Sequence, residues 1–197
     1  MLPSDIISHI FDFNGVNNFK NLQIVNKEFD LNVKKQIKEH AYIKFSLIRN
    51  MPKEEQDTFK RILYDLDEPL VAYLLPKFTK SLSIISETFD HPITEPNVLP
   101  SSLIDLYLGH RFSQPLTEPN VLPCNLEELH FGKYFDSEIG LNVLPSTLKK
   151  LVFGKFYSGP IPDDIPASLT YLQVGKHYGY MSALENLPSS IEVDFDY

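Results

Sequence analysis

The chain has almost no cysteine and lacks tryptophan. It has one cysteine, Cys124, and no tryptophan among its 197 residues. A single cysteine excludes an internal disulfide framework. With six scattered histidines and no H-x-x-x-H spacing, it also leaves no zinc site of the usual kind. This composition is typical of a reducing compartment, so we expect a cytoplasmic location.

Long apolar runs are also missing. No window of 18 residues is wholly apolar, so we expect no transmembrane helix and no membrane partner. The opening residues Met1–Asp5 lack a basic segment followed by an apolar one, so we expect no signal peptide. Apolar residues still make up 43% of the chain, which is enough for a packed core.

Positive charge is scarce in the second part of the chain. Residues 75–197 hold 8 Lys and Arg against 15 Asp and Glu, a net charge of −7 out of −8 for the whole chain. Such a surface repels phosphate backbones, so we expect no nucleic-acid partner. Proline is concentrated there as well, with 12 of 15 at or after Pro76. We infer that two architectures join near this position.

Motifs for catalysis and cofactor binding are absent from the sequence. There is no G-x-S-x-G, no phosphate-binding loop and no G-x-G-x-x-G. Paired carboxylates, such as Glu127 and Glu128, are explained as solvated side chains. The sequence therefore predicts no catalytic residue, no metal and no cofactor. A hydrolase or transferase hidden in the chain has no constellation to support it.

What the chain does contain is an internal repeat of about 22 residues. The pattern starts with an aliphatic residue and a proline, continues as L-x-x-L-x-L, and then has a glycine and an aromatic three residues later. The prolines are Pro100, Pro123, Pro145, Pro166 and Pro188. The glycines are Gly109, Gly132, Gly154 and Gly175, and the aromatics are Phe112, Phe135, Tyr157 and Tyr178.

Each repeat is interpreted as one coil of a solenoid. The last two leucines stand two residues apart, as same-face positions on a strand must. We expect the glycine to end the strand because the turn needs a backbone conformation that side chains resist. The repeating aromatics then form a core ladder. Stacked coils bury together what one coil cannot bury alone.

Leu122–Ile139 resembles the FNIP repeat, a short relative of the leucine-rich repeat (LRR), although Asp136 replaces the signature Asn. The resemblance implies an LRR-like stack with a parallel sheet on one face. It also implies a social amoeba, or a giant virus of amoebae, as the source, and the host cytoplasm as the location if the source is viral. A degenerate first copy has its strand at Ser81–Ile84, and the last strand alternates Ile191, Val193 and Phe195 with acids.

The first part of the chain is predicted to be helical. Apolar residues at helical spacing run through residues 1–50, and Pro52 with Glu54 and Glu55 is typical of a new helix start. We expect Phe59, Ile62, Leu63 and Leu66 to form that helix's buried face and to plug the stack. The prediction is an α+β solenoid with a helical head over 1–50, a connecting helix over 51–74 and about five repeats over 75–197.

Residues 1–45 resemble an F-box, on Leu2-Pro3-x-Asp5-Ile6-Ile7-x-x-Ile10-Phe11 and Phe19-x-x-Leu22-x-x-Val25-Asn26-Lys27-x-Phe29. Lys34–Ile48 matches the family's third helix only loosely. The resemblance implies docking to the Skp-type adaptor of a Skp–cullin–F-box ubiquitin ligase. The matching apolar residues are Leu2, Pro3, Ile6, Ile7, Ile10, Leu22 and Val25. A purely helical cap for the repeats explains most of the same residues, and the chain would then be a stand-alone scaffold or decoy.

The non-leucine positions of each strand point away from the core and give a candidate face for an unknown target protein. They are Asp105, Tyr107, Glu128, His130, Lys150, Val152, Tyr171 and Gln173, followed by Glu192 and Asp194. Tyr107 and Tyr171 are candidate anchors, because tyrosine is enriched at interface hot spots. The alternative is a plain solvated sheet face.

Overall fold

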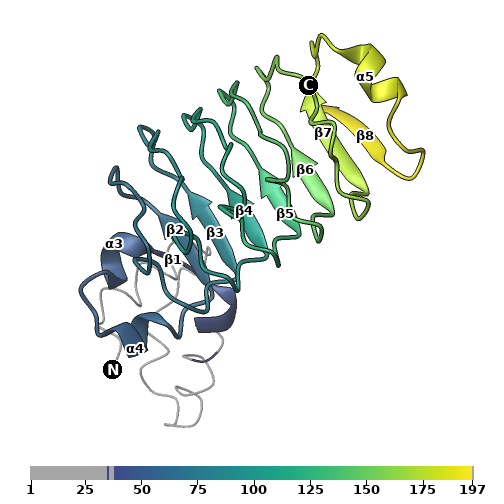
Figure 1. Cartoon of the computed structure of the whole chain (residues 1–197). Coiled ribbons are helices and arrows are strands. Elements are labelled where there is room, and N and C mark those ends of the chain that lie inside the picture. Colours follow the sequence, from purple (N-terminus) through teal and green to yellow (C-terminus); the bar gives the residue numbers. More distant parts are fainter. Residues whose placement is uncertain (1–34, 36–37, 197) are drawn as a thin grey trace, which may run out of the picture.

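A computed structural model describes residue 35 and residues 38–196. Within them, eight strands form one parallel sheet whose spatial order is the chain order, β1 to β8 (Figure 1). The strands are β1 (Tyr42–Lys44), β2 (Arg61–Tyr64), β3 (Ser81–Ile84), β4 (Asp105–Tyr107), β5 (Glu128–His130), β6 (Lys150–Val152), β7 (Tyr171–Gly175) and β8 (Glu192–Asp196). The helices are α3 (Phe45–Ile48), α4 (Lys53–Gln56) and α5 (Met181–Glu185).

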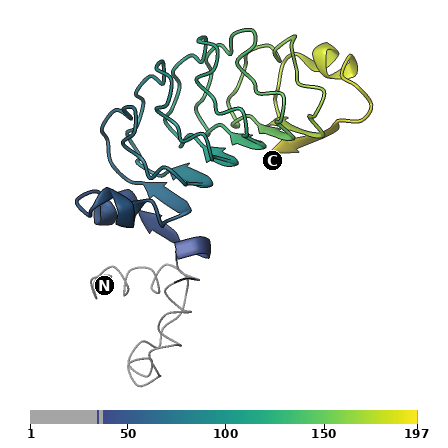
Figure 2. The same cartoon turned by 60° about the horizontal axis from the view of Figure 1, so that its bottom comes forward.

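The sheet forms one side of a stack of coils, each named here by the number of its strand. Figure 2 shows the strands along one side and the loops along the opposite, outer side. Leu106, Leu129, Leu151 and Leu172 face one another in register and are fully buried. The predicted LRR-like solenoid with a parallel sheet is therefore confirmed.

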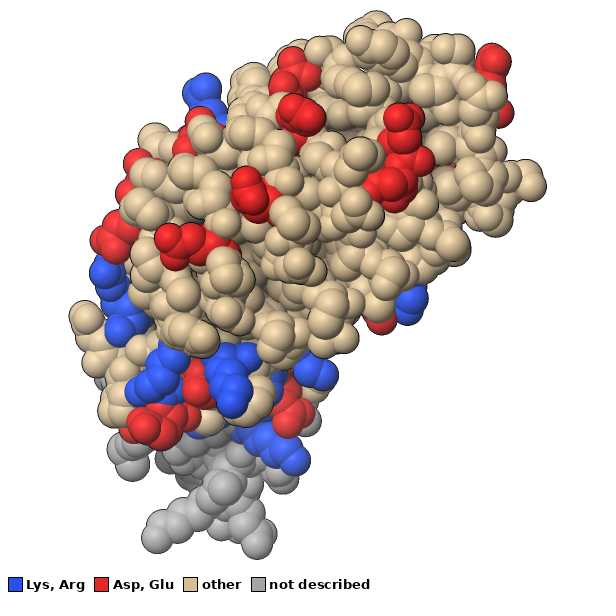
Figure 3. All heavy atoms as spheres, in the orientation of Figure 1, with Lys and Arg blue, Asp and Glu red and all other residues tan. Residues whose placement is uncertain are grey.

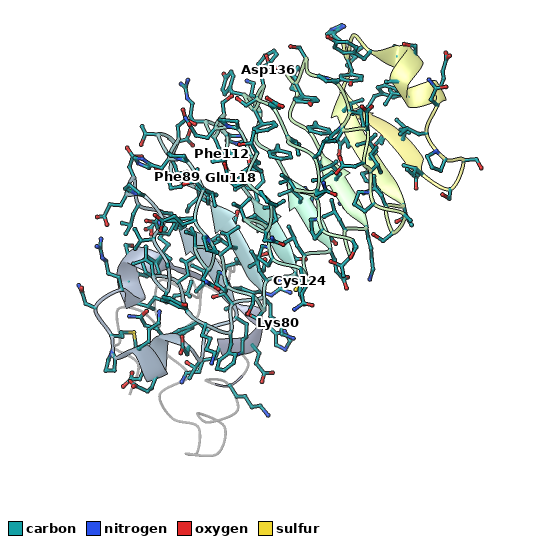
Figure 4. All side chains as sticks on the ribbon, in the orientation of Figure 1. Lys80, Phe89, Phe112, Glu118, Cys124 and Asp136 are labelled. Carbon is teal, nitrogen blue, oxygen red and sulfur yellow. The ribbon has the colours of Figure 1, made fainter. Side chains whose placement is uncertain are left out.

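A ladder of aromatic rings runs through the core. It links Phe45, Tyr64, Phe89, Phe112, Phe135, Tyr157 and Tyr178. Neighbouring ring centroids lie 5.6 to 6.4 Å apart. Figure 4 labels two members in successive coils, Phe89 and Phe112. All four aromatics predicted to form a core ladder belong to it, and Phe45, Tyr64 and Phe89 extend it toward the N-terminal coils.

Glycine is required at the repeat positions for a different reason from the one expected. Of the glycines that the structure describes, only Gly109 has a φ in the left-handed region, at +80°. A Cβ on Gly132 would lie 1.7 Å from the carbonyl oxygen of Gly109, and one on Gly154 would lie 1.9 Å from that of Gly132. These glycines are needed because successive turns approach each other closely, and not because of a special φ.

A second turn lies before three successive Leu-Pro pairs, at Leu99, Leu122 and Leu144. Asn97, Asn120 and Asn142 adopt φ values of 63°, 65° and 60° there. Asparagine tolerates the left-handed conformation better than most side chains, which accounts for its recurrence at this position. The equivalent residue one coil earlier is Tyr73, with a φ of 62°.

The predicted helix over 51–74 is wrong. Only Lys53–Gln56 is helical, and Arg61–Tyr64 is strand β2, with Phe59, Ile62 and Leu63 buried as parts of a further coil. The loosely matched third F-box helix is also wrong as one element, because β1 interrupts Lys34–Ile48. The sheet thus begins within residues 38–74, earlier than predicted.

The rest of the predicted head falls on residues 1–34, outside the described residues. The docking candidates Leu2, Pro3, Ile6, Ile7, Ile10, Leu22 and Val25 all lie there. Among the described residues, no helix is long and apolar enough to cross a membrane.

Candidate target-binding face

The parallel register places the predicted target-binding residues side by side. One column is Tyr42, Arg61, Ser81, Asp105, Glu128, Lys150, Tyr171 and Glu192. The other is Lys44, Leu63, Ser83, Tyr107, His130, Val152, Gln173 and Asp194. We call these two columns the sheet face. All eight predicted residues are half-buried and adjacent, and their role in binding stays a prediction.

The middle of the sheet face is acidic. Burial raises the pKa of Asp105, and the neighbouring Glu128 carboxylate raises it further, while Arg61 and a hydrogen bond from Ser81 act in the opposite direction. Glu128 also lies 3.3 Å from His130 Nε2 and 4.0 Å from Lys150 Nζ. The centre can therefore accept hydrogen bonds from a cationic partner group, in competition with the neighbouring His130 and Lys150 side chains.

A polar network occupies the C-terminal part of the sheet face. The Tyr171 hydroxyl donates to Asp194 Oδ2 at 2.8 Å, and this hydrogen bond is the main cause that raises the pKa of Tyr171. Lys150 Nζ lies 5.2 Å from the centre of the Tyr171 ring. These contacts hold the ring of a candidate anchor in one orientation before any partner arrives, which lowers the entropy cost of binding.

The side chain of Tyr107, the other candidate anchor, is held by a residue of its own coil. Its hydroxyl lies 2.9 Å from His110 Nδ1, and the two rings meet edge to face at 5.9 Å. Burial raises the pKa of the Tyr107 hydroxyl, so it is neutral and able to donate at physiological pH. His110, one residue after the repeat glycine Gly109, thus positions a residue of the sheet face.

The sequence prediction missed the N-terminal third of the sheet face. Tyr42 hydrogen-bonds Ser81 Oγ at 2.9 Å, and the Arg61 guanidinium lies 5.3 Å from the Tyr42 ring centre. The signal was present, because Phe59-x-x-Ile62-x-Tyr64 has the same spacing as L-x-x-L-x-L. These residues add positive charge at one end of the face.

Other types of site are weakly supported within the described part of the chain. No group of three or more His, Cys, Asp or Glu residues could hold a metal ion there. A hollow of about 620 Å³ lies between the loop of coil 6 and α5. Its lining combines aliphatic residues such as Ile161 and Leu187 with the polar side chains of Asp163, Asn186 and Ser190, and no further feature of the described chain indicates a ligand for it.

Comparisons with known proteins agree with this geometry. Residues 67–111 and 112–156 each match the family model described as FNIP Repeat. A structure described as "The crystal structure of CroV588 a novel circular LRR protein structure" is 34% identical, with a TM-score of 0.60. The alignment covers 70% of this chain and 20% of that one, so this chain spans about a fifth of that protein's length.

The comparison with curated proteins found no match. The two family matches meet without a gap and contain strands β3 to β6, whose coils carry the aromatic ladder and the centre of the sheet face. These findings support a repeat protein of the FNIP and leucine-rich-repeat type.

Proposed function

We propose that the protein is an interaction scaffold that binds a target protein on the sheet face. The observation that carries this proposal is the sheet face itself, whose two columns cross all eight strands, with tyrosines already oriented by hydrogen bonds. The mixed charges would give specificity and fast association more than raw affinity. The expected cytoplasmic location belongs to this proposal.

Replacing both anchors tests the sheet face. Tyr107→Ala with Tyr171→Ala should reduce target capture by about tenfold or more, because each ring fills a hot-spot position. The measurement is photo-crosslinking from a probe placed at Gln173, in parallel with one at Glu118 in the loops (Figure 4). The matched control is Tyr73→Ala with Tyr180→Ala, since both rings are exposed away from the sheet.

Crosslinked products from Gln173 that persist in the anchor variant would contradict the proposal. Products that arise equally from Glu118 would mean that the loops bind the target. A circular-dichroism melt of each variant shows whether the stack is intact.

We further propose that residues 1–34 recruit a Skp-type adaptor, which would make the chain a substrate adaptor of a ubiquitin ligase. The support is the F-box resemblance of Leu2–Phe11 and of Phe19–Val25, together with the repeats behind them. The alternative is a stand-alone scaffold or decoy. It would bind its target and no ligase component.

The structure changes how the adaptor proposal must be tested. Ile43, Phe45 and Ile48 are buried in coil 1, so deleting residues 1–50 would damage the stack itself. Ile6→Asp with Ile10→Asp in the full chain is the better variant. Purified Skp-type adaptor at micromolar concentration should bind the wild-type chain and not this variant in size-exclusion chromatography. If the wild-type chain forms no complex with the adaptor, the adaptor proposal is wrong and the stand-alone scaffold remains.

A further inference from the structure

Half of the positively charged residues in the acidic region 75–197 lie in the same turn of successive coils. Of the eight Lys and Arg residues in 75–197, four fall in the turn after the strands: Arg111, Lys133, Lys155 and Lys176. They come from four successive coils at equivalent positions, one or two residues after the repeat glycine. Four coils about 4.8 Å apart give a row about 14 Å long.

Two exposed aromatic rings lie among these cations. The side chains of Tyr134 and Phe156 are 41% and 51% exposed, and their rings stack at 5.5 Å. Lys133 Nζ lies 5.2 Å from the Tyr134 ring centre and 5.5 Å from that of Phe156. We call Arg111, Lys133, Tyr134, Lys155 and Phe156 the basic–aromatic stripe.

The cations of the stripe keep their charge available. Among the ion pairs of the described residues, none involves Arg111, Lys133 or Lys155. Arg111 lies over the other ring, 5.1 Å from the centre of Tyr134. The nearby Asp136 carboxylate accepts hydrogen bonds from the backbone and hydroxyl of Ser158 at 2.7 to 3.1 Å. Among the described residues, Asp136 forms no ion pair with Arg111, Lys133 or Lys155.

We infer that the basic–aromatic stripe binds a short, extended, acidic peptide segment of the target, with an apolar side chain seated on Tyr134 and Phe156. The inference rests on the proposed scaffold function and adds a second contact surface to it. Charge complementarity carries it, because unpaired cations beside exposed rings attract a carboxylate that flanks an apolar group.

The surroundings of the stripe favour a short peptide over a nucleic acid. Asp and Glu side chains spread over the middle and C-terminal coils on the face of Figure 3, and Lys and Arg gather near the N-terminal coils. Residues 75–197 carry a net charge of −7, so a long polyanion that ran beyond the stripe would meet an acidic surface. The three coils of the stripe span about 10 Å, and an extended peptide rises about 3.3 Å per residue, so about three residues cover it.

The test uses the full chain and a fluorescein-labelled peptide, Gly-Glu-Glu-Phe-Glu-Glu-Phe-Glu-Glu-Gly, measured by fluorescence anisotropy at low salt. The wild-type chain should bind it, and binding should weaken as salt is added. Lys133→Glu with Lys155→Glu should weaken binding by about tenfold or more, because two attractions become repulsions. Tyr134→Ser with Phe156→Ser should weaken binding of this peptide more than binding of a version with Ser at both Phe positions.

The matched control is Lys77→Glu with Lys80→Glu, which changes the net charge equally. Figure 4 shows Lys80 on the opposite side of the stack from Asp136, which follows Tyr134 by two residues. This control should bind the peptide within twofold of the wild-type chain. Equal losses in both variants would mean a diffuse charge effect and would overturn the inference.

Two further outcomes would also overturn it. One is an unlabelled single-stranded RNA decamer that displaces the acidic peptide or binds more tightly than it does. The other is no peptide binding by a wild-type chain that still crosslinks its target from Gln173. That second result removes the stripe and leaves the sheet face intact, so the failure of this inference is distinct from failure of the scaffold proposal.

Discussion

At the scale of the residue, the fold depends on positions where one coil constrains the next. Gly154 is required because the carbonyl oxygen of Gly132 occupies the space of its missing side chain, at 1.9 Å from an ideal Cβ. Ser102, Thr147 and Ser168 each donate a hydroxyl hydrogen bond to backbone carbonyls of the preceding coil. These contacts satisfy loop carbonyls that would otherwise have no partner inside the stack.

Tyr73 is the residue that departs from this pattern. It adopts the left-handed conformation that three asparagines take in the following coils, yet its ring is 75% exposed and makes little packing contact. A bulky side chain in this conformation costs about 1 kcal/mol or more. The strain is therefore not repaid by burial.

Tyr73→Asn should raise the free energy of unfolding by about 1 kcal/mol, since asparagine adopts this φ more readily. A urea melt followed by circular dichroism measures it. The reciprocal change, Asn120→Tyr, should lower stability by a similar amount. A lower stability of Tyr73→Asn would show that the exposed tyrosine ring makes a stabilising contact after all.

At the scale of the element, the strands could be predicted wherever the repeat is regular. β4 to β7 coincide with the L-x-x-L-x-L segments, because alternation and the glycine together indicate a strand, whereas β8 was indicated by alternation alone. β2 was predicted as helix, since Phe59, Ile62 and Leu63 also fit a helical stripe. Apolar residues three apart and then one or two apart fit both a helix and a strand. Only the repeat distance from Ile62 to Leu82 and on to Leu106 shows that the segment is a strand.

The candidate site divides in the same way. The sheet face follows from strand alternation alone, so its eight central residues were predictable from the sequence. The basic–aromatic stripe was not predicted, because the repeat indicates which aromatics are buried but not that the exposed neighbours Tyr134 and Phe156 stack on each other beside cations. The buried aromatic is Phe135 in coil 5 and Tyr157 in coil 6.

Titration of the Asp105 carboxyl group in β4 makes the stability of the fold depend on pH. Burial and Glu128 raise its pKa above the ordinary value. The folded chain therefore holds this proton more tightly than the unfolded chain. The resulting stability is fully present below the unfolded pKa of about 4 and is lost as pH rises through the folded pKa.

Asp105→Asn removes that titration. The melting temperature of the variant, relative to wild type, should be higher at pH 7 than at pH 4, because asparagine carries no charge to desolvate. Thermal melts at both pH values measure the difference. Glu118→Gln, at an exposed loop position, is the control. A relative melting temperature that does not change with pH would mean that Asp105 is solvated in the folded chain.

At the scale of the whole molecule, the described chain is a one-dimensional stack. Each strand pairs only with its sequence neighbours, from β1 to β8, so stability is close to a sum of coil and interface contributions. The aromatic ladder and the inter-coil hydroxyl bonds couple neighbours strongly. Coupling between distant coils can pass only through the coils between them.

Two matched core truncations test this picture. Leu129 in β5 and Leu172 in β7 are both fully buried at the same register position. Leu→Ala at such a site costs about 2–5 kcal/mol. Hydrogen exchange read by mass spectrometry should show the largest loss of protection at β5 for Leu129→Ala and at β7 for Leu172→Ala, decreasing along the stack. The same uniform loss in both variants would instead mean that the eight strands unfold as one unit, and a target bound on the sheet face would then stabilise every coil equally.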